Sequence, residues 1–197
     1  MKRNILVGFV VVLLVVGAIF MNTDKEKEAS LPPENTTQLD ESGTDEPEPI
    51  TQTKSEPLQE GATAIDFELE TRTGDTLRLY NHDGKPTLIN FWASWCPPCK
   101  KEMPDIQKAY EKYGDEVNFF MVDLTFNDDI DAMNEYIEEN QFTFPVLLDK
   151  TGDVMMDYQV MVIPTTYFVD ANHVISHKVM GPMTSEHIQS IMDEITK

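Results

Sequence analysis

The sequence predicts an α/β domain in which helices cover a central mixed β-sheet, and three observations support this fold class. Over residues 61–197, apolar runs of strand length alternate with segments of helical periodicity. A hairpin pattern opens this region, and a second hairpin followed by a helix closes it. With 197 residues, the chain has room for one such domain and additional segments.

The first half of the domain predicts a hairpin, a buried strand and a long helix. Polar and apolar residues alternate on both sides of Gly74, as in a hairpin, and a nearly continuous apolar run then predicts a central strand. Pro97 suits the first helical turn and Gly114 follows the helix end. The predicted segments are strands 66–70, 76–80 and 87–92 and helix 97–113.

The second half repeats this alternation. Asp128 or Asp129 can cap a helix that reaches Glu139, and Asn172 marks the turn of the second hairpin. No internal repeat is visible. The predicted segments are strand 117–122, the helix ending at 139, the extended segment 145–148, a brief helix 154–158, strands 163–169 and 174–180, and the terminal helix 185–195.

Residues 1–21 predict an uncleaved N-terminal membrane anchor. An apolar run from Ile5 to Met21 follows Lys2 and Arg3, which would hold that end in the cytoplasm and direct the rest of the chain outward. A cleaved signal peptide is the alternative, but the exit from the run lacks small residues at alternate positions. Both interpretations place the domain outside the cytoplasm, and the anchor predicts a single-pass protein of the cell membrane with the domain on its extracytoplasmic face.

Residues 22–60 predict a disordered acidic linker, and residues 61–197 the folded domain. The linker is rich in Glu, Asp, Thr, Ser and Pro and has no aromatic residue, so it cannot bury enough apolar surface to become ordered. The formal net charge of the whole chain is −20, which repels phosphate backbones and argues against a nucleic-acid partner.

The two cysteines of the chain predict redox chemistry. Cys96 and Cys99 are too close in sequence to act as a structural cross-link of much value. Their Cys-x-x-Cys pattern stands between a buried strand and a helix start. Free N–H groups and the helix dipole favour the thiolate of Cys96 there, whereas Cys99 lies one turn inside the helix. We therefore expect Cys96 to be the nucleophile and Cys99 the resolving thiol.

A metal site is the alternative explanation of the cysteine pair. Zinc would need two more ligands, and no second cysteine pair exists. His173 and His177 are four residues apart but are expected in one strand, too far separated to chelate easily. Copper binding by methionines is less favoured than packing. The sequence therefore predicts no metal and no organic cofactor, with a Cys96–Cys99 disulfide as the redox group.

The chain resembles the TlpA/ResA-like family of membrane-anchored thiol-disulfide oxidoreductases of the thioredoxin superfamily. The resemblance covers nearly all of residues 61–197. It implies a thioredoxin-like fold with an N-terminal hairpin and with an inserted helix near residues 128–140. It rests on residues 90–104 (NFWASWCPPCKKEMP), 144–149 (FPVLLD) and 163–167 (IPTTY).

The resemblance also implies roles for residues around the cysteines. Pro164 matches the cis-proline of the superfamily, which would present the backbone of Ile163 to an extended substrate. Trp95 matches the tryptophan that covers the disulfide, and Pro97 stiffens the motif. These four residues are the expected substrate-binding set. Pro104 matches the proline that kinks the first helix of family members.

Glu102 is the expected acid–base residue. Thioredoxin has a buried Asp at the position of Asn90, and an Asn cannot accept a proton there. Glu102 matches the acidic residue that the family places beside its cysteines, on the helix face of Cys99. It could exchange protons with the thiols and disfavour their ionised forms. The alternative is a solvated surface Glu.

The expected reaction is dithiol–disulfide exchange. The resemblance implies a reductant for disulfide-containing protein substrates in an oxidising compartment, with apocytochrome c as a candidate. A membrane electron donor would recharge it, because no further cysteine can relay electrons. The alternatives are a disulfide-forming oxidase, a non-redox binding or chaperone module, and a thiol peroxidase. The last is disfavoured because the Pro-x-x-x-Thr-x-x-Cys setting of peroxiredoxins is missing.

Overall fold

A five-stranded mixed sheet forms the centre of the domain. The computed structural model describes residues 58–81 and 83–197. The strand order is β5-β4-β3-β6-β7, with β3, β4 and β5 parallel and β6 and β7 antiparallel to their neighbours. The sheet confirms the predicted fold class. Its strands are β3 (Thr87–Trp92), β4 (Asn118–Asp123), β5 (Val146–Leu148), β6 (Thr165–Val169) and β7 (Ile175–Met180).

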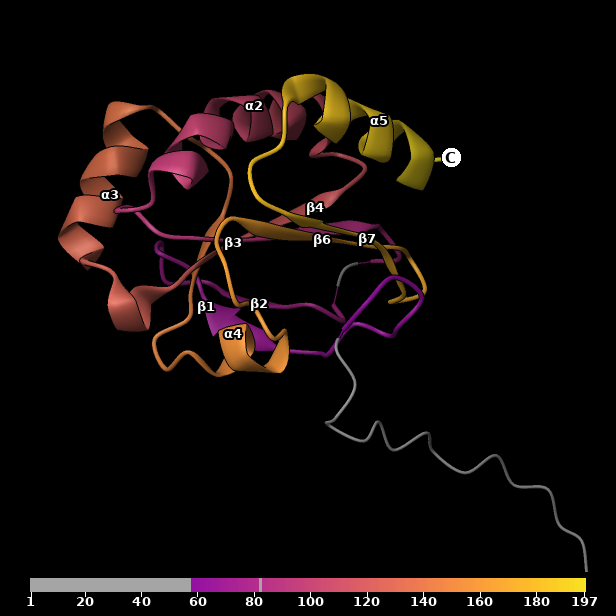
Figure 1. Ribbon diagram of the computed structural model, residues 1–197, viewed down its shortest axis with the longest axis horizontal. Coiled ribbons are helices and arrows are strands. Elements are labelled where there is room, and N and C mark those ends of the chain that lie inside the picture. The colour runs from indigo at the N-terminus through magenta and orange to yellow at the C-terminus, as the bar shows by residue number, and fades with distance from the viewer. Residues whose placement is uncertain (1–57, 82) are drawn as a thin grey trace, which may run out of the picture. The chain divides into compact units, whose positions relative to one another are not determined.

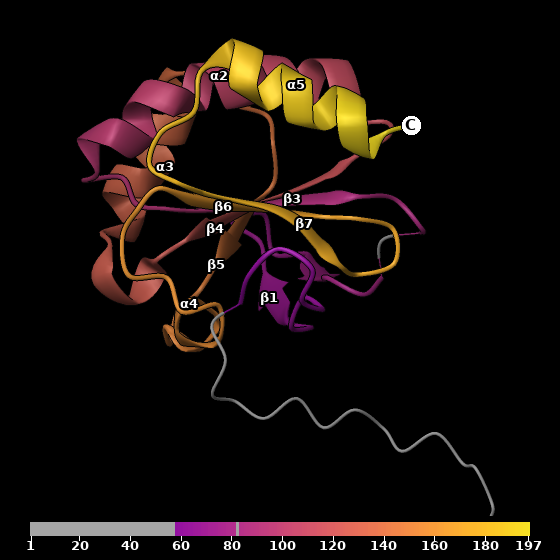
Figure 2. The ribbon, with the colours of Figure 1, turned by 45° about the vertical axis from the view of Figure 1, so that its right-hand side comes forward.

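Two layers cover the faces of this sheet (Figures 1 and 2). Helices α2 (Pro97–Tyr113), α3 (Ile130–Glu139) and α5 (Ser185–Ile195) contribute to the core on one face. The short helix α4 (Asp153–Asp157) packs on the opposite face, together with the hairpin β1 (Glu68–Glu70) and β2 (Thr76–Arg78). A single 3-10 turn, η1 (Thr125–Asn127), connects β4 to α3.

Strand β3 runs through the middle of both cores. All six of its residues are buried, as its apolar run predicts. Leu88 and Trp92 belong to the core under α2, α3 and α5, whereas Ile89 and Phe91 belong to the opposite core. Because side chains alternate along a strand, Asn90 points to the same face as Leu88 and Trp92. A polar side chain is thereby placed beneath helix α2.

Helix α2 begins and ends where the sequence predicts. Cys96 is its N-cap, Pro97 and Pro98 occupy the first positions and Gly114 is the C-cap. Pro104 lies inside the helix and has no N–H to donate to the carbonyl of Lys100. The hydroxyl of Tyr136 on α3 donates to that carbonyl at 3.2 Å, so another helix satisfies the group that the proline leaves free.

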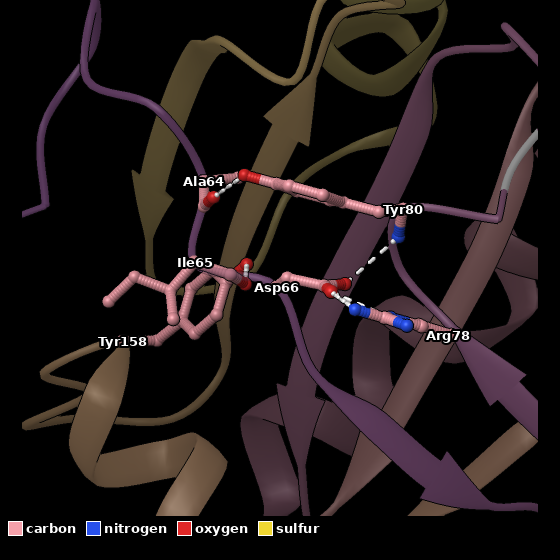
Figure 3. A network of polar contacts seen from close by, with 6 residues as sticks. All are labelled: Ala64, Ile65, Asp66, Arg78, Tyr80 and Tyr158. Carbon is pink, nitrogen blue, oxygen red and sulfur yellow. Dashed lines mark hydrogen bonds and ion pairs between the residues drawn. The ribbon is translucent and has the colours of Figure 1, made fainter. Parts of the chain in front are cut away.

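The first hairpin is shorter than predicted (Figure 3). At its open end, hydrogen bonds and an ion pair made by side chains hold the two segments together. The backbone N–H of Tyr80 donates to the Asp66 carboxylate at 3.1 Å, and Arg78 forms an ion pair with the same group at 2.6 Å. The hydroxyls of Tyr80 and Tyr158 donate to the carbonyls of Ala64 and Ile65, each at 2.7 Å.

Of the other segments, β4, β5, α4 and β7 differ from their predicted bounds by one residue and β6 by two, and one of the two predicted caps of α3 is used. Strand β6 begins at Thr165 instead of residue 163, since Pro164 has no N–H for the ladder. Helix α3 is capped by Asp129, whose side chain accepts from the N–H groups of Asp131 and Ala132, and not by Asp128. Among the described residues, no helix has the length and apolar character to cross a membrane. The predicted anchor and nearly all of the predicted linker lie outside the described residues.

Candidate active site

The cysteine pair lies at the junction of strand β3 and helix α2. Cys96 and Cys99 form a disulfide with Cα atoms 5.3 Å apart. The backbone N–H of Cys99 donates to Sγ of Cys96 at 3.2 Å, so the first cysteine caps the helix with its sulfur. Such a donor, together with the helix dipole, stabilises negative charge on Cys96 when the pair is reduced. Cys99 is fully buried.

The loop before strand β6 lies beside this disulfide. The carbonyl oxygen of Ile163 is 3.8 Å from Sγ of Cys96, and the Ile163–Pro164 peptide bond is cis. The backbone N–H of Gly181 donates to the carbonyl of Pro164 at 2.8 Å and ties the loop to the end of β7. The structure therefore brings Cys96 next to Ile163 and Pro164, which follow it in the sequence by about 70 residues.

The surface around the pair is apolar. Trp95 is 53% exposed, and its indole N–H donates to the carbonyl of Asn127 at 2.8 Å, which turns the ring toward η1. Pro97 is exposed at the first position of α2. Met161 and Val162, just before the cis bond, are 89% and 53% exposed. An extended chain that reaches Cys96 would thus meet apolar side chains on both sides.

An open hollow of about 470 Å³ lies beside the segment that leads into this loop. Met161 lines it from the loop, Met155 and Met156 from α4, and Met180 from the end of β7. Methionine side chains adapt to apolar groups of different shape. The hollow extends the apolar surface beyond Ile163 and Pro164.

Glu102 lies in the interior, which rules out the solvated surface position considered above. Its side chain is 1% exposed. Oε1 accepts a hydrogen bond from Nδ2 of Asn90 at 2.8 Å, and Oε2 accepts one from the backbone N–H of Met183 at 2.9 Å. Burial raises the pKa of Glu102 to about 7, and these two hydrogen bonds oppose part of the rise. The carboxyl group therefore changes protonation near neutral pH.

Cys99 and Glu102 are one turn apart on the buried face of α2. An ionised thiolate is costly in such apolar surroundings, so Cys99 needs a base when it attacks. A carboxyl group that titrates near neutral pH can take and return that proton. Asn90, at the position of the buried Asp of thioredoxin, does not itself exchange protons but donates to the residue that can.

The two histidines that the sequence analysis weighed as metal ligands, His173 and His177, do not lie in the same element. His173 lies in the turn before β7 with a φ of 65°, instead of in the strand as predicted, and its ring stacks on Tyr80. His177 lies within β7 and faces Glu194 at 3.7 Å. In the part of the chain that the structure describes, no group of three or more His, Cys, Asp or Glu side chains could hold a metal ion.

Sequence reasoning did not identify the contacts that hold the segment before Cys96. Ser94 is bound by Asp128, which the sequence offered only as a possible helix cap. The two consecutive aspartates at positions 128 and 129 could have indicated this contact. Only one of them is needed to cap the helix, so the other carboxylate is available to bind a different segment.

The sheet and the helix-capping cysteine pair define the class of thioredoxin-like redox proteins. The profile of the AhpC/TSA family matches residues 61–178, which include both cysteines. The thioredoxin-like protein YneN of Bacillus subtilis is 37% identical over 137 residues, covering 69% of this chain and 80% of that protein.

Two further comparisons define the family more narrowly. The thiol-disulfide oxidoreductase ResA of Bacillus thuringiensis subsp. konkukian is 31% identical over 145 residues, covering 73% of this chain and 83% of that protein. The crystal structure of StoA from Bacillus subtilis is matched with a TM-score of 0.59 and 34% identity, covering 66% of this chain and 97% of StoA. The chain belongs to the family of thiol-disulfide oxidoreductases that includes ResA and StoA, and it is an enzyme of this kind.

Proposed function

We propose that the protein is a membrane-anchored, extracytoplasmic reductant of disulfides in secreted or membrane proteins. The observation that carries this proposal is the buried carboxyl group of Glu102 behind the cysteine pair. A dithiol becomes a strong oxidant when its reduced, thiolate form is stabilised. A carboxylate in the dry interior beside Cys99 has the opposite effect, since it repels a second negative charge. The pair then gives up electrons more readily.

The reaction begins with the reduced enzyme. The thiolate of Cys96 attacks one sulfur of a target disulfide, that S–S bond breaks, and a mixed disulfide forms between Cys96 and the target. The released target sulfur takes a proton. Glu102 then accepts the proton of Cys99, whose thiolate attacks Sγ of Cys96. The products are the Cys96–Cys99 disulfide and a target with two thiols, so two electrons have moved to the target.

The apolar surface at the cysteines supports a protein substrate. An extended chain can lie along the backbone at Ile163 and Pro164, with Trp95 and Pro97 on the other side of Cys96. The methionine-lined hollow can receive an apolar side chain near the target cysteine. The Cys-x-x-Cys pair of apocytochrome c before haem attachment is our candidate substrate, because its two cysteines form a disulfide in an oxidising compartment.

Turnover requires an external source of electrons. Cys96 and Cys99 are the only cysteines of the chain, so no internal relay can reduce their disulfide. We propose that a membrane electron donor attacks the disulfide at Cys96. An anchor at residues 1–21 would keep the domain close to such a donor.

Capture of mixed disulfides tests this proposal. The full-length Cys99→Ser variant cannot resolve its mixed disulfide, so in cells it should accumulate substrates bound to Cys96. The matched control, Cys96→Ser, lacks the nucleophile and should capture nothing. We expect secreted or membrane proteins, among them apocytochrome c. If both variants capture the same proteins, or none, the role proposed for Cys96 in cells is wrong.

A disulfide-forming oxidase is the second candidate, and one observation favours it. The N–H of Cys99 points at Sγ of Cys96 and stabilises a thiolate there, as in oxidants of this fold. The redox state of captured proteins separates the two candidates. In cells that lack the enzyme, substrates of a reductant accumulate as disulfides, whereas substrates of an oxidase accumulate as thiols.

A further inference from the structure

Asp128 holds the segment that leads into Cys96. The backbone N–H and the hydroxyl of Ser94 both donate to the Asp128 carboxylate, the hydroxyl at 2.6 Å. The N–H of Asp129 donates to the same group at 2.8 Å. Next to this contact, the indole N–H of Trp95 donates to the carbonyl of Asn127. The two residues before Cys96 are thus held by two consecutive residues, the last residue of η1 and the residue that follows it.

Asp123 lies behind this contact. It is the last residue of β4 and is fully buried. Its Oδ1 accepts a hydrogen bond from the hydroxyl of Thr125 at 2.7 Å. Its Oδ2 has no hydrogen-bond donor among the described residues, and the carboxyl group of Asp128 disfavours the ionised form of Asp123. Two facing carboxyl oxygens can form a hydrogen bond only when one of them carries a proton.

The charges around Asp123 favour that proton. Asp128 acts on it from the loop before α3 and Asp149 from the residue after β5, and both are acidic. The carboxylate of Asp149 accepts hydrogen bonds from the backbone N–H groups of Gly152 and Met155, each at 2.9 Å. Burial, and then the contact with Asp128, raise the pKa of Asp123 to about 8.

We infer that Asp123 carries a proton that it donates to Asp128, and that this contact positions Ser94 and Trp95 so that Cys96 can exchange disulfides. With the proton present, Asp123 donates to Asp128, whose oxygens still accept from Ser94. Without it, two carboxylates face each other in a site with little water. Asp128 is only half-buried and can move toward solvent, and its contact with Ser94 would then be lost. Both acids act through Ser94, so they are positioning residues.

Infrared spectroscopy of the oxidised full chain tests whether the proton is there. The cysteines do not titrate in this state, and a Glu102→Gln background removes the other buried acid of the site. We expect the C=O band of a protonated carboxyl group at pH 7, its loss as the pH rises past about 8, and its absence in Glu102→Gln/Asp123→Asn. A band that survives Asp123→Asn unchanged would overturn the inference.

The pH profile of reduction tests the positioning role. We expect the rate at which a small dithiol reduces Cys96–Cys99, corrected for ionisation of the dithiol, to fall about fivefold through the same transition. That factor corresponds to one hydrogen bond of about 1 kcal/mol. Asp123→Asn should keep the faster rate at every pH, because an amide donates to Asp128 whether or not the pH is high. A purely structural role would instead change the rate equally at all pH values.

Ser94→Ala gives a second test that leaves both acids in place. It removes one donor to the Asp128 carboxylate, so that this carboxylate accepts more strongly from protonated Asp123 and the fall in rate moves to higher pH. Profiles that coincide for wild type, Asp123→Asn and Ser94→Ala would contradict the inference. It rests on the disulfide exchange proposed above, but not on its direction. If the enzyme proves to be an oxidase in cells, the results expected from infrared spectroscopy and from the pH profiles stay the same.

Discussion

Nδ2 of Asn90 donates a hydrogen bond to Oε1 of Glu102 at 2.8 Å, across the interface between the central strand and the helix that carries the cysteines. The same amide group donates to Oγ1 of Thr166 at 2.9 Å, whereas Oδ1 of Asn90 has no donor within the described chain. Asn90 is fixed by the sheet, so it orients the Glu102 carboxyl group from the rigid side of the interface. The proposed acid–base residue is on the helix, and the residue that orients it is on the strand.

Replacing Glu102 by Gln should slow disulfide exchange and leave the fold intact. The amide cannot accept the proton of Cys99, and loss of a positioned acid–base group costs about a hundredfold in rate. Rotation of the Asn90 amide would let its free Oδ1 accept from the new Gln, so the interior stays paired. Single-turnover reduction of a model disulfide protein between pH 5 and 9 measures the effect. A wild-type rate across this range would remove Glu102 from the mechanism.

The same variant should be more stable than wild type at alkaline pH. The pKa of Glu102 is raised from 4.5 to about 7, so between these values the folded chain holds a proton that the unfolded chain has lost. Wild-type stability therefore falls as the pH rises from about 4.5 to 7 and then levels off. The full penalty is about 3 kcal/mol. Denaturant unfolding of both proteins at pH 5 and pH 8 measures it, and a constant difference between them would contradict the assignment.

Asn90→Asp restores the acid that thioredoxin has at this position and should shift the pH profile upward. The amide donor that favours ionised Glu102 is lost, and a second carboxyl group takes its place. Like charges in one buried site oppose ionisation, so the carboxyl pair should lose its last proton above the pH at which Glu102 alone does. The exchange rate as a function of pH reports this. A profile displaced to lower pH would show that Asn90 does not favour the ionised form of Glu102.

The hydrogen bond from Tyr136 to the carbonyl of Lys100, which Pro104 leaves without a helical donor, predicts a coupling between helices α2 and α3. Tyr136→Phe removes the hydroxyl that satisfies the carbonyl of Lys100, at a cost of about 1 kcal/mol. In a Pro104→Ala background, the new N–H can bond the same carbonyl within the helix, so Tyr136→Phe should cost much less there. A double-mutant cycle in urea measures the difference. Equal costs in both backgrounds would mean that the hydroxyl does not replace the missing helical bond.

The bounds of helix α2 could be predicted because its signals are local: prolines at the start, a glycine at the end and apolar spacing between them. The central strand was equally clear from its apolar run. Contacts between distant segments were not predictable from local pattern. The end of the first hairpin depends on Asp66 and Tyr80 meeting across the turn, and the place of Asp128 depends on Ser94, 34 residues away.

In the candidate site, too, some features could be predicted from the sequence and others depend on contacts between distant segments. Cys96 and Cys99 follow from their spacing at a helix start, and the family resemblance pointed to Glu102 and Pro164. The sequence left open whether Glu102 was buried, because Asn90 and Met183 approach it only in the folded chain. Asp123 gave no signal, since an acidic residue that ends a strand is ordinarily found in solvent.

The reduction potential of the Cys96–Cys99 pair tests the proposed direction of electron flow most directly. The full chain in detergent can be equilibrated in thiol buffers of known potential and its redox state followed by tryptophan fluorescence, since Trp95 adjoins Cys96. We predict a value near or below that of thioredoxin, roughly −270 mV. A value close to that of the oxidant DsbA, roughly −120 mV, would contradict the proposal and make the protein a disulfide-forming enzyme.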